Sequence, residues 1–152
     1  MLKIDVICIA HIKNNAFADL IAMYEKRINW PLNIIDLESK HTNPQKCQND
    51  EADKIMKHIN NQSVVIALDE KGKTYSSIAL SKKLEQFAHD GQNHIQFIIG
   101  GADGLTQVVR QKCDLIMSFG QQTWPHALAR VMLLEQIYRS QQILAGHPYH
   151  RE

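Results

Sequence analysis

The sequence predicts an α/β domain built on a mostly parallel sheet of five to six strands, with helices on both faces. Short runs rich in β-branched residues alternate along the chain with longer amphipathic segments. These segments are about 10–15 residues long, which suits right-handed crossovers between parallel strands. No linker, internal repeat or low-complexity segment interrupts the alternation, so we expect residues 1–152 to form a single domain.

The first three elements are predicted to be a strand, a helix and a second strand. Residues 2–10 are rich in β-branched side chains and indicate a buried strand. Asn14 or Asn15 can cap the helix that follows, and Pro31 ends it, because the residue before a proline avoids the helical region. The second strand covers residues 32–37. The apolar residues that recur at helical spacing are Phe17, Leu20, Ile21, Tyr24 and Ile28.

The middle of the chain is predicted to form a loop, a helix and a third strand. Residues 39–48 are polar and contain a proline, which indicates an exposed loop. A helix covers about residues 50–60, and the apolar residues 64–68 form a buried strand. The charged, glycine-containing run at residues 69–73 is predicted to be a turn.

The remaining elements continue the alternation to the end of the chain. Ser76 or Ser77 caps a helix, and Asp90 and Gly91 mark its end. A strand, a short helix, a strand and a long helix then follow, at residues 95–99, 107–111, 115–118 and 126–145.

Composition and charge limit the classes of protein that the chain can represent. The sequence has 44% hydrophobic and 22% charged residues, which is ordinary for a globular domain. A net charge of +1 argues against a protein that coats nucleic acid without specificity, although it allows a local basic patch. No apolar run reaches the roughly 20 residues that span a bilayer, so we expect no membrane segment.

The cysteines and the first residues favour a cytoplasmic protein. Cys8, Cys47 and Cys113 are odd in number and far apart, so they fit neither a disulfide framework nor a CxxC metal site. Residues 1–5 include an acid and show no signal-peptide pattern. We therefore expect a reducing, cytoplasmic location.

Three strand ends carry sequences that suit a ligand site, at residues 68–69, 100–101 and 118–120. Ligands of open parallel sheets bind at the carboxyl ends of the strands, and glycine lets a backbone amide approach a ligand closely. The GGxxG pattern that ends at Gly104 matches neither a Walker loop nor a dinucleotide fingerprint. The glycines alone are equally compatible with a simple turn from strand to helix.

The loop at residues 119–125 carries two large aromatic side chains, Phe119 and Trp124, in a segment unsuited to a helix or strand. Such a loop suits a flat heteroaromatic ligand, with backbone groups for hydrogen bonds and apolar side chains for the ring faces. An aromatic plug that closes the end of the sheet is the alternative interpretation.

The last helix and the tail after it indicate an interface and a site. The helix is apolar beyond one stripe, which favours packing on two sides and hence a homodimer. Glu135 and Arg139 have the spacing of an ordinary stabilising ion pair. The tail at residues 147–152 consists mostly of groups that move protons or bind phosphate. We expect no metal site there, because no carboxylate or cysteine cluster accompanies His147 and His150.

Four segments together resemble one family of enzymes. They are Ile99–Leu105, Thr123–His126, Arg130–Arg139 and His147–Arg151, with the sequences IGGADGL, TWPH, RVMLLEQIYR and HPYHR. The whole length of the chain resembles the RlmH family of the SPOUT superfamily, whose members methylate N3 of a pseudouridine in 23S rRNA.

The resemblance implies a fold with a C-terminal trefoil knot, a homodimer, and a binding site for S-adenosylmethionine in the knot. It also implies that the substrate is a stem-loop of the large-subunit rRNA within assembled 70S ribosomes. By motif match, the cofactor-binding residues are Leu68, Gly100, Phe119, Gly120, Gln121, Gln122, Thr123 and Trp124.

The resemblance directs the catalytic assignment to the tail. The methyl group of S-adenosylmethionine is already activated, so positioning supplies much of the acceleration without a metal. The pseudouridine N3–H must lose its proton, which requires a general base or a cation that stabilises the developing anion. We assign His150 as the base, Arg151 as the group that holds phosphate or the anionic base edge, and Tyr149 as a stacking or hydrogen-bonding residue. His126 and Arg139 are second choices.

Two other functions are compatible with parts of the sequence. A small NAD(P)-dependent oxidoreductase would need a glycine-rich turn after the first strand, but residues 9–12 contain no glycine. A non-catalytic module that binds a ribosome or a partner protein would tolerate loss of the titratable groups of the tail. The sequence leaves open which residue takes the proton, whether a partner's tail completes each site, and whether uridine is accepted.

Overall fold

The computed structural model describes residues 1–10, 12 and 15–151. This part of the chain forms a single sheet of five strands in the order β2-β1-β4-β3-β5, and every neighbouring pair is parallel. The strands are β1 (Lys3–Ile9), β2 (Leu32–Leu37), β3 (Val64–Thr74), β4 (His94–Ile99) and β5 (Leu115–Ser118). The helices are α1 (Ala16–Arg27), α2 (Pro44–His58), α3 (Ser77–His89), α4 (Gln107–Lys112) and α5 (His126–Leu144). The predicted parallel α/β architecture is confirmed.

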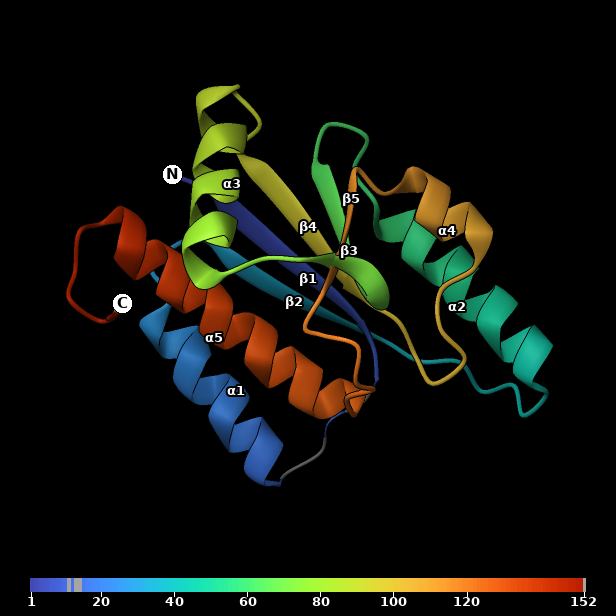
Figure 1. Ribbon diagram of the computed structural model, residues 1–152. Coiled ribbons are helices and arrows are strands. Elements are labelled where there is room, and N and C mark those ends of the chain that lie inside the picture. The colour runs from blue at the N-terminus through green and yellow to red at the C-terminus, as the bar shows by residue number, and fades with distance from the viewer. Residues whose placement is uncertain (11, 13–14, 152) are drawn as a thin grey trace.

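Helices cover both faces of the sheet. α1, α3 and α5 lie on one face, and α2 and α4 lie on the other (Figure 1). Successive strand residues point to opposite faces, so each strand supplies two separate cores. Val6, Ile66 and Phe97 belong to the core under α1, α3 and α5, whereas Ile7 and Ile98 belong to the core under α2 and α4. All five side chains are fully buried.

α5 is the central helix of its layer. It contacts α1 on one side and α3 on the other, and Leu133, Leu134 and Ile137 are fully buried beneath it. The wide apolar surface from which we predicted a second copy is therefore covered largely by helices of the same chain. The homodimer stays a prediction. No helix of the described ranges is long and apolar enough to cross a membrane.

Two predicted helix caps are confirmed by hydrogen bonds. Oδ1 of Asn15 accepts hydrogen bonds from the backbone N–H groups of Phe17 at 3.0 Å and Ala18 at 3.1 Å. Oγ of Ser76 accepts one from the N–H of Ala79 at 3.0 Å. These bonds satisfy donors that the first turn of a helix leaves unpaired. Asn14, the alternative cap of α1, lies outside the described residues.

The predicted start of the second helix was wrong. α2 begins at Pro44, so half of the loop expected at residues 39–48 is helical. Proline suits the first turn of a helix, where its missing N–H has no intrahelical partner. Oδ1 of Asn43 caps this turn by accepting a hydrogen bond from the N–H of Lys46 at 3.1 Å.

The predicted turn after the third strand was also wrong, because β3 continues to Thr74. Leu68 and Lys73 both lie opposite Met117 of β5, so residues 69–72 leave the ladder and form a bulge before pairing resumes. The bulge lies at the carboxyl end of the first half of β3. It therefore faces the edge of the sheet where a ligand is expected.

Candidate functional site

A cleft of about 870 Å³ lies at the carboxyl ends of β3, β4 and β5. Its walls are residues 68–71 of the β3 bulge, residues 99–105 after β4, and the loop between β5 and α5, with Arg110 and Ala129 at its margins. Parallel strands bring their carboxyl ends to one edge, so three segments distant in sequence meet there.

Seven of the eight predicted cofactor-binding residues line this one cleft: Leu68, Gly100, Phe119, Gly120, Gln122, Thr123 and Trp124. Gln121 is not among the lining residues and is exposed to solvent. The predicted convergence of three strand ends is therefore found in the structure. The contact of each residue with a cofactor stays a prediction.

Hydrogen bonds fix the shape of the loop at residues 119–125. Oγ1 of Thr123 donates to Oε2 of Glu70 at 2.8 Å, which ties the loop to the β3 bulge. Nε1 of Trp124 donates to the backbone oxygen of Phe119 at 3.4 Å. Trp124 is 38% exposed, which argues against an aromatic plug. These hydrogen bonds hold the loop in a closed turn, and one side of this turn faces the cleft.

Gly120 allows the chain to turn sharply out of β5. Its φ is +110°, a conformation that residues with a Cβ rarely adopt. Oγ of Ser118 accepts a hydrogen bond from the N–H of Gly120 at 3.0 Å and donates to its carbonyl oxygen at 2.7 Å. Ser118 therefore fixes both peptide groups of the turn that begins the predicted cofactor loop, residues 119–125.

The charge of Asp69 in the cleft is compensated. Its carboxylate forms an ion pair with Arg110 of α4 and accepts a hydrogen bond from the N–H of Lys71 at 2.9 Å. The pair connects the bulge to the glycine-rich segment, because α4 directly follows that segment. No sequence pattern indicated this role for Arg110, since a single arginine on a short helix belongs to no motif.

The tail folds back onto the end of α5. Oη of Tyr149 donates to Oε1 of Glu135 at 3.1 Å. The guanidinium of Arg139 bonds to the same carboxylate at 2.6 Å and lies 4.7 Å from the centre of the Tyr149 ring. Burial, and then the Glu135 carboxylate, raise the pKa of Tyr149. The Glu135–Arg139 pair predicted from spacing is confirmed, and the tail packs against it.

His150 is held by the same arginine. Nη1 of Arg139 lies 3.1 Å from Nδ1 of His150. A guanidinium can only donate, so Nδ1 is the acceptor in this hydrogen bond. The lone pair that would take a proton from a substrate is therefore engaged in this arrangement. Arg151 is exposed.

The tail and the cleft lie at opposite ends of α5. His126, the first residue of α5, lines the cleft, whereas Tyr149, His150 and Arg151 follow its last turn. The helix has 19 residues, which corresponds to a length of about 28 Å. Figure 1 shows the C-terminus beyond the end of α5 that is remote from the cofactor loop. The structure does not bring the predicted catalytic residues to the cleft of their own chain.

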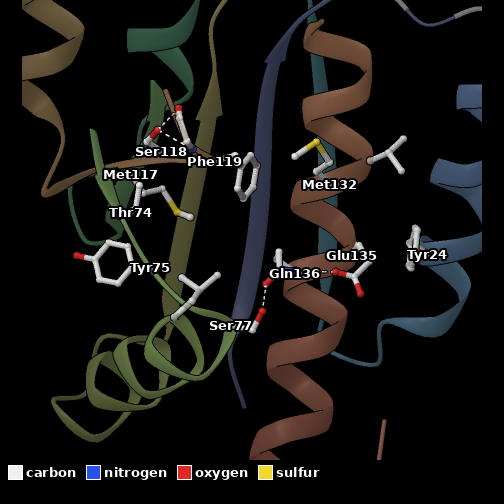
Figure 2. A pocket seen from close by; sticks show the side chains of 13 residues that line it. Tyr24, Thr74, Tyr75, Ser77, Met117, Ser118, Phe119, Met132, Glu135 and Gln136 are labelled. Carbon is white, nitrogen blue, oxygen red and sulfur yellow. Dashed lines mark hydrogen bonds between the residues drawn. The ribbon is translucent and has the colours of Figure 1, made fainter. Parts of the chain in front are cut away.

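A second cavity of about 550 Å³ adjoins the cleft and shares Phe119 and Gly120 with it. Figure 2 shows that α5 forms one wall, where Oε1 of Gln136 accepts a hydrogen bond from Oγ of Ser77 at 2.8 Å. Glu135, the partner of the tail, also lines this cavity. The cavity therefore extends from the cofactor loop toward the tail. No motif in the sequence indicated it.

The described residues include no group of three His, Cys, Asp or Glu side chains that could hold a metal ion. The cleft is lined by the glycines of residues 100–104, by the aromatic side chains of Phe119 and Trp124, and by charged side chains of the β3 bulge.

Comparison with known proteins identifies the family. The sequence model described as "Predicted SPOUT methyltransferase" matches residues 2–150. The chain belongs to this family. Relatives named ribosomal RNA large subunit methyltransferase H support the assignment. The protein of Rhodospirillum centenum is 44% identical over 134 residues, 88% of each chain. That of Zymomonas mobilis is 39% identical over 151 residues, 99% of each chain. That of Bifidobacterium adolescentis is 38% identical over 160 residues, 99% of this chain and 100% of the relative.

Membership of the SPOUT methyltransferase family confirms the predicted enzyme class and the knotted α/β fold. Enzymes of this family generally use S-adenosylmethionine as the methyl donor. The cleft lies where the sequence placed the cofactor loops. A dinucleotide-dependent oxidoreductase and a non-catalytic binding module are both inconsistent with this membership.

Proposed function

We propose that this chain transfers the methyl group of S-adenosylmethionine to N3 of a pseudouridine in 23S rRNA, within assembled 70S ribosomes in the cytoplasm. The cleft is the observation that carries the proposal, because seven predicted cofactor residues from three distant segments line it. The names of relatives that match nearly the whole chain support rRNA as the substrate.

The cleft fits S-adenosylmethionine in size and in chemistry. Its volume of about 870 Å³ lies within the range of small-molecule sites. Phe119, Trp124 and Leu105 supply apolar surface for a purine ring, and Gly100 exposes backbone groups for its polar edge. Bound S-adenosylmethionine supplies a methyl group that needs no further activation. The residues of the chain therefore orient the donor, exclude water and hold the acceptor in line.

Proton removal from the acceptor N3–H needs a base at the cleft. His126 lines the cleft and is the local candidate. His150 is the candidate from the tail, because Arg139, a cation that can stabilise an anion, lies beside its imidazole. Arg151 is exposed, and we assign it the contact with a phosphate of the substrate.

The tail acts in a homodimer, where it completes the cleft of the other copy. Tyr149 and His150 bond to Glu135 and Arg139, which lie roughly 14 Å and 20 Å along α5 from His126 at the cleft. A tail residue therefore reaches the reacting atoms from a second subunit. Two-fold symmetry would then give two equivalent sites, each with cofactor loops from one subunit and a tail from its partner.

The first experiment measures methyl transfer from labelled S-adenosylmethionine to 70S ribosomes that lack the modification, and identifies the labelled nucleoside by mass. N3-methylpseudouridine is the expected product. Label in another nucleoside would contradict the proposed acceptor. Absence of transfer with normal cofactor binding would mean that the substrate is another molecule. Absence of both transfer and binding would contradict the proposed cofactor.

A second experiment tests whether the tail acts in the partner's site. Gly100→Val places a side chain against Leu105, whose Cδ2 would lie 2.8 Å from the new Cβ, and should abolish cofactor binding. His150→Ala should lower turnover and leave cofactor affinity normal. Each variant alone should be nearly inactive. Subunits of the two variants refolded together should regain about a quarter of wild-type activity, because about half of the dimers are mixed and carry one intact site. No recovery would contradict the shared site.

A further inference from the structure

A buried carboxylate lies behind the glycine-rich wall of the cleft. Glu51 of α2 is only 6% exposed. Its Oε2 is inaccessible to solvent and has no hydrogen-bond partner among the described residues. Its Oε1 accepts a weak hydrogen bond from Sγ of Cys47 at 3.4 Å. A buried carboxylate with so little compensation is costly for the folded protein, and burial raises the pKa of Glu51.

The carboxylate points at the main chain of Gly101. A Cβ built on Gly101 would lie 2.8 Å from Oε1 and 3.0 Å from Oε2 of Glu51. Gly101 itself lines the cleft. Because residue 101 has no side chain, Glu51 packs directly against the backbone that forms the wall. Little protein therefore separates its carboxylate from a ligand in the cleft.

The other carboxylates at the cleft are paired or solvated. Asp69 forms its ion pair with Arg110, Oε2 of Glu70 accepts a hydrogen bond from Thr123, and Asp103 is exposed. Within the described ranges, no Lys or Arg forms a salt bridge with Glu51. Glu51 is thus a buried carboxylate at the wall without a salt-bridge partner among the described residues, although His126 across the cleft acts on it electrostatically.

We propose that Glu51 is a specificity-determining residue of the cleft, whose charge favours S-adenosylmethionine over the demethylated product. The donor carries a positive sulfonium, whereas the product S-adenosylhomocysteine carries a neutral thioether in its place. A carboxylate in surroundings of effective dielectric constant about 20 attracts a cation even at about 10 Å. The same residue then helps to release the product, because methyl transfer removes the charge that it attracts. This inference rests on the proposed function.

The test compares the affinities of both ligands for the full-length protein by isothermal titration calorimetry. Glu51→Gln removes the charge and keeps the shape of the side chain. It should weaken S-adenosylmethionine about tenfold, equivalent to about 1.4 kcal/mol, and change S-adenosylhomocysteine less than about twofold. Asp53→Asn, the same change at an exposed position of α2, is the matched control and should alter neither affinity.

Several outcomes would overturn the inference. Equal weakening of the binding of both ligands would mean that Glu51 holds the glycine-rich segment in place and does not discriminate by charge. Unchanged affinities would mean that Glu51 has no effect on the ligand in the cleft. The ligand-free Glu51→Gln variant should melt no lower than wild type, because it loses an uncompensated charge. A less stable or unfolded variant would show that the carboxylate already has a partner in the protein. If the wild type binds neither ligand, the proposed cofactor fails instead.

Discussion

Replacing Gly72 by alanine should destabilise the protein, because residue 72 lies against the main chain of β5. A Cβ at this position would lie 2.7 Å from the carbonyl oxygen of Ile116 and 2.7 Å from the carbonyl carbon of Met117. Non-bonded carbon atoms are attracted at about 3.5–4.0 Å, so these contacts are repulsive. Backbone atoms inside a strand cannot rotate away as a side chain does.

The expected cost follows from how the clash can be relieved. The bulge at residues 69–72 must move away from β5 by several tenths of an ångström, which strains the pairing that resumes at Lys73. Overpacking of this kind costs about 1–3 kcal/mol. For a domain of this length, we expect the melting temperature to fall by about 3–9 °C. Asp69 and Glu70 move with the bulge, so the affinity for S-adenosylmethionine should fall as well.

Thermal unfolding followed by circular dichroism, together with a titration of S-adenosylmethionine, measures both effects. Gly91→Ala is the matched control, because Gly91 has a φ of +80° but nothing within 4 Å of its would-be Cβ. The control carries only the backbone strain, about 1–2 kcal/mol. If Gly72→Ala melts at the temperature of the wild type, the close packing of the bulge on β5 is refuted.

Three further changes test other parts of the site. Tyr149→Phe removes the hydrogen bond to Glu135 and should lower the free energy of unfolding by about 1 kcal/mol in a urea titration; no change would mean that the tail is not anchored there. Gly120→Ala adds strain without a clash, so the melting temperature should fall by a few degrees while cofactor affinity falls at least about tenfold; normal affinity would contradict the role of this turn. Burial raises the pKa of Cys8 to about 12 and that of Cys113 to about 11, so both thiols should stay protonated and resist iodoacetamide at about pH 8; rapid alkylation of the native protein would contradict this.

Local signals were sufficient to predict most elements of the fold. The strand predicted at residues 32–37 has the same bounds as β2, and the caps at Asn15 and Ser76 are where the side-chain chemistry placed them. Such features depend on a few adjacent residues, so the sequence contains them in full. The knot does not depend on any local pattern, and only the resemblance to a family predicted it.

The β3 bulge could not be predicted because its cause lies elsewhere in the chain. Residues 69–73 are charged and contain glycine, which is typical of a turn. The strand nevertheless resumes, because Lys73 meets Met117 of β5, a partner more than 40 residues away in sequence. Pairing with a distant strand outweighed the local preference.

Glu51 illustrates the same limit at the site. It lies in the segment QNDEADK, where several neighbouring acids and amides are solvated, and no residue type distinguishes the buried carboxylate from an exposed one. Its burial depends on Gly101, which forms part of the cleft wall and packs directly on the carboxylate. The strand ends that line the cleft could be predicted from the sequence. The groups behind and beside them could not, because their positions depend on how distant segments pack together.

The hydrogen bond between the tail and α5 bears on how His150 could act in the proposed dimer. Nδ1 of His150 accepts a hydrogen bond from Arg139, so the base is occupied while the tail rests on α5. A phosphate of the substrate rRNA competes for the same guanidinium, since arginine binds phosphate through charge-assisted bonds. Engagement of the substrate would then release the lone pair of His150 at the partner's cleft, and the base would become active only with rRNA in place. The ¹⁵N shifts of the His150 imidazole should therefore change when a 23S rRNA stem-loop is added. Shifts that stay constant through saturation would contradict this coupling.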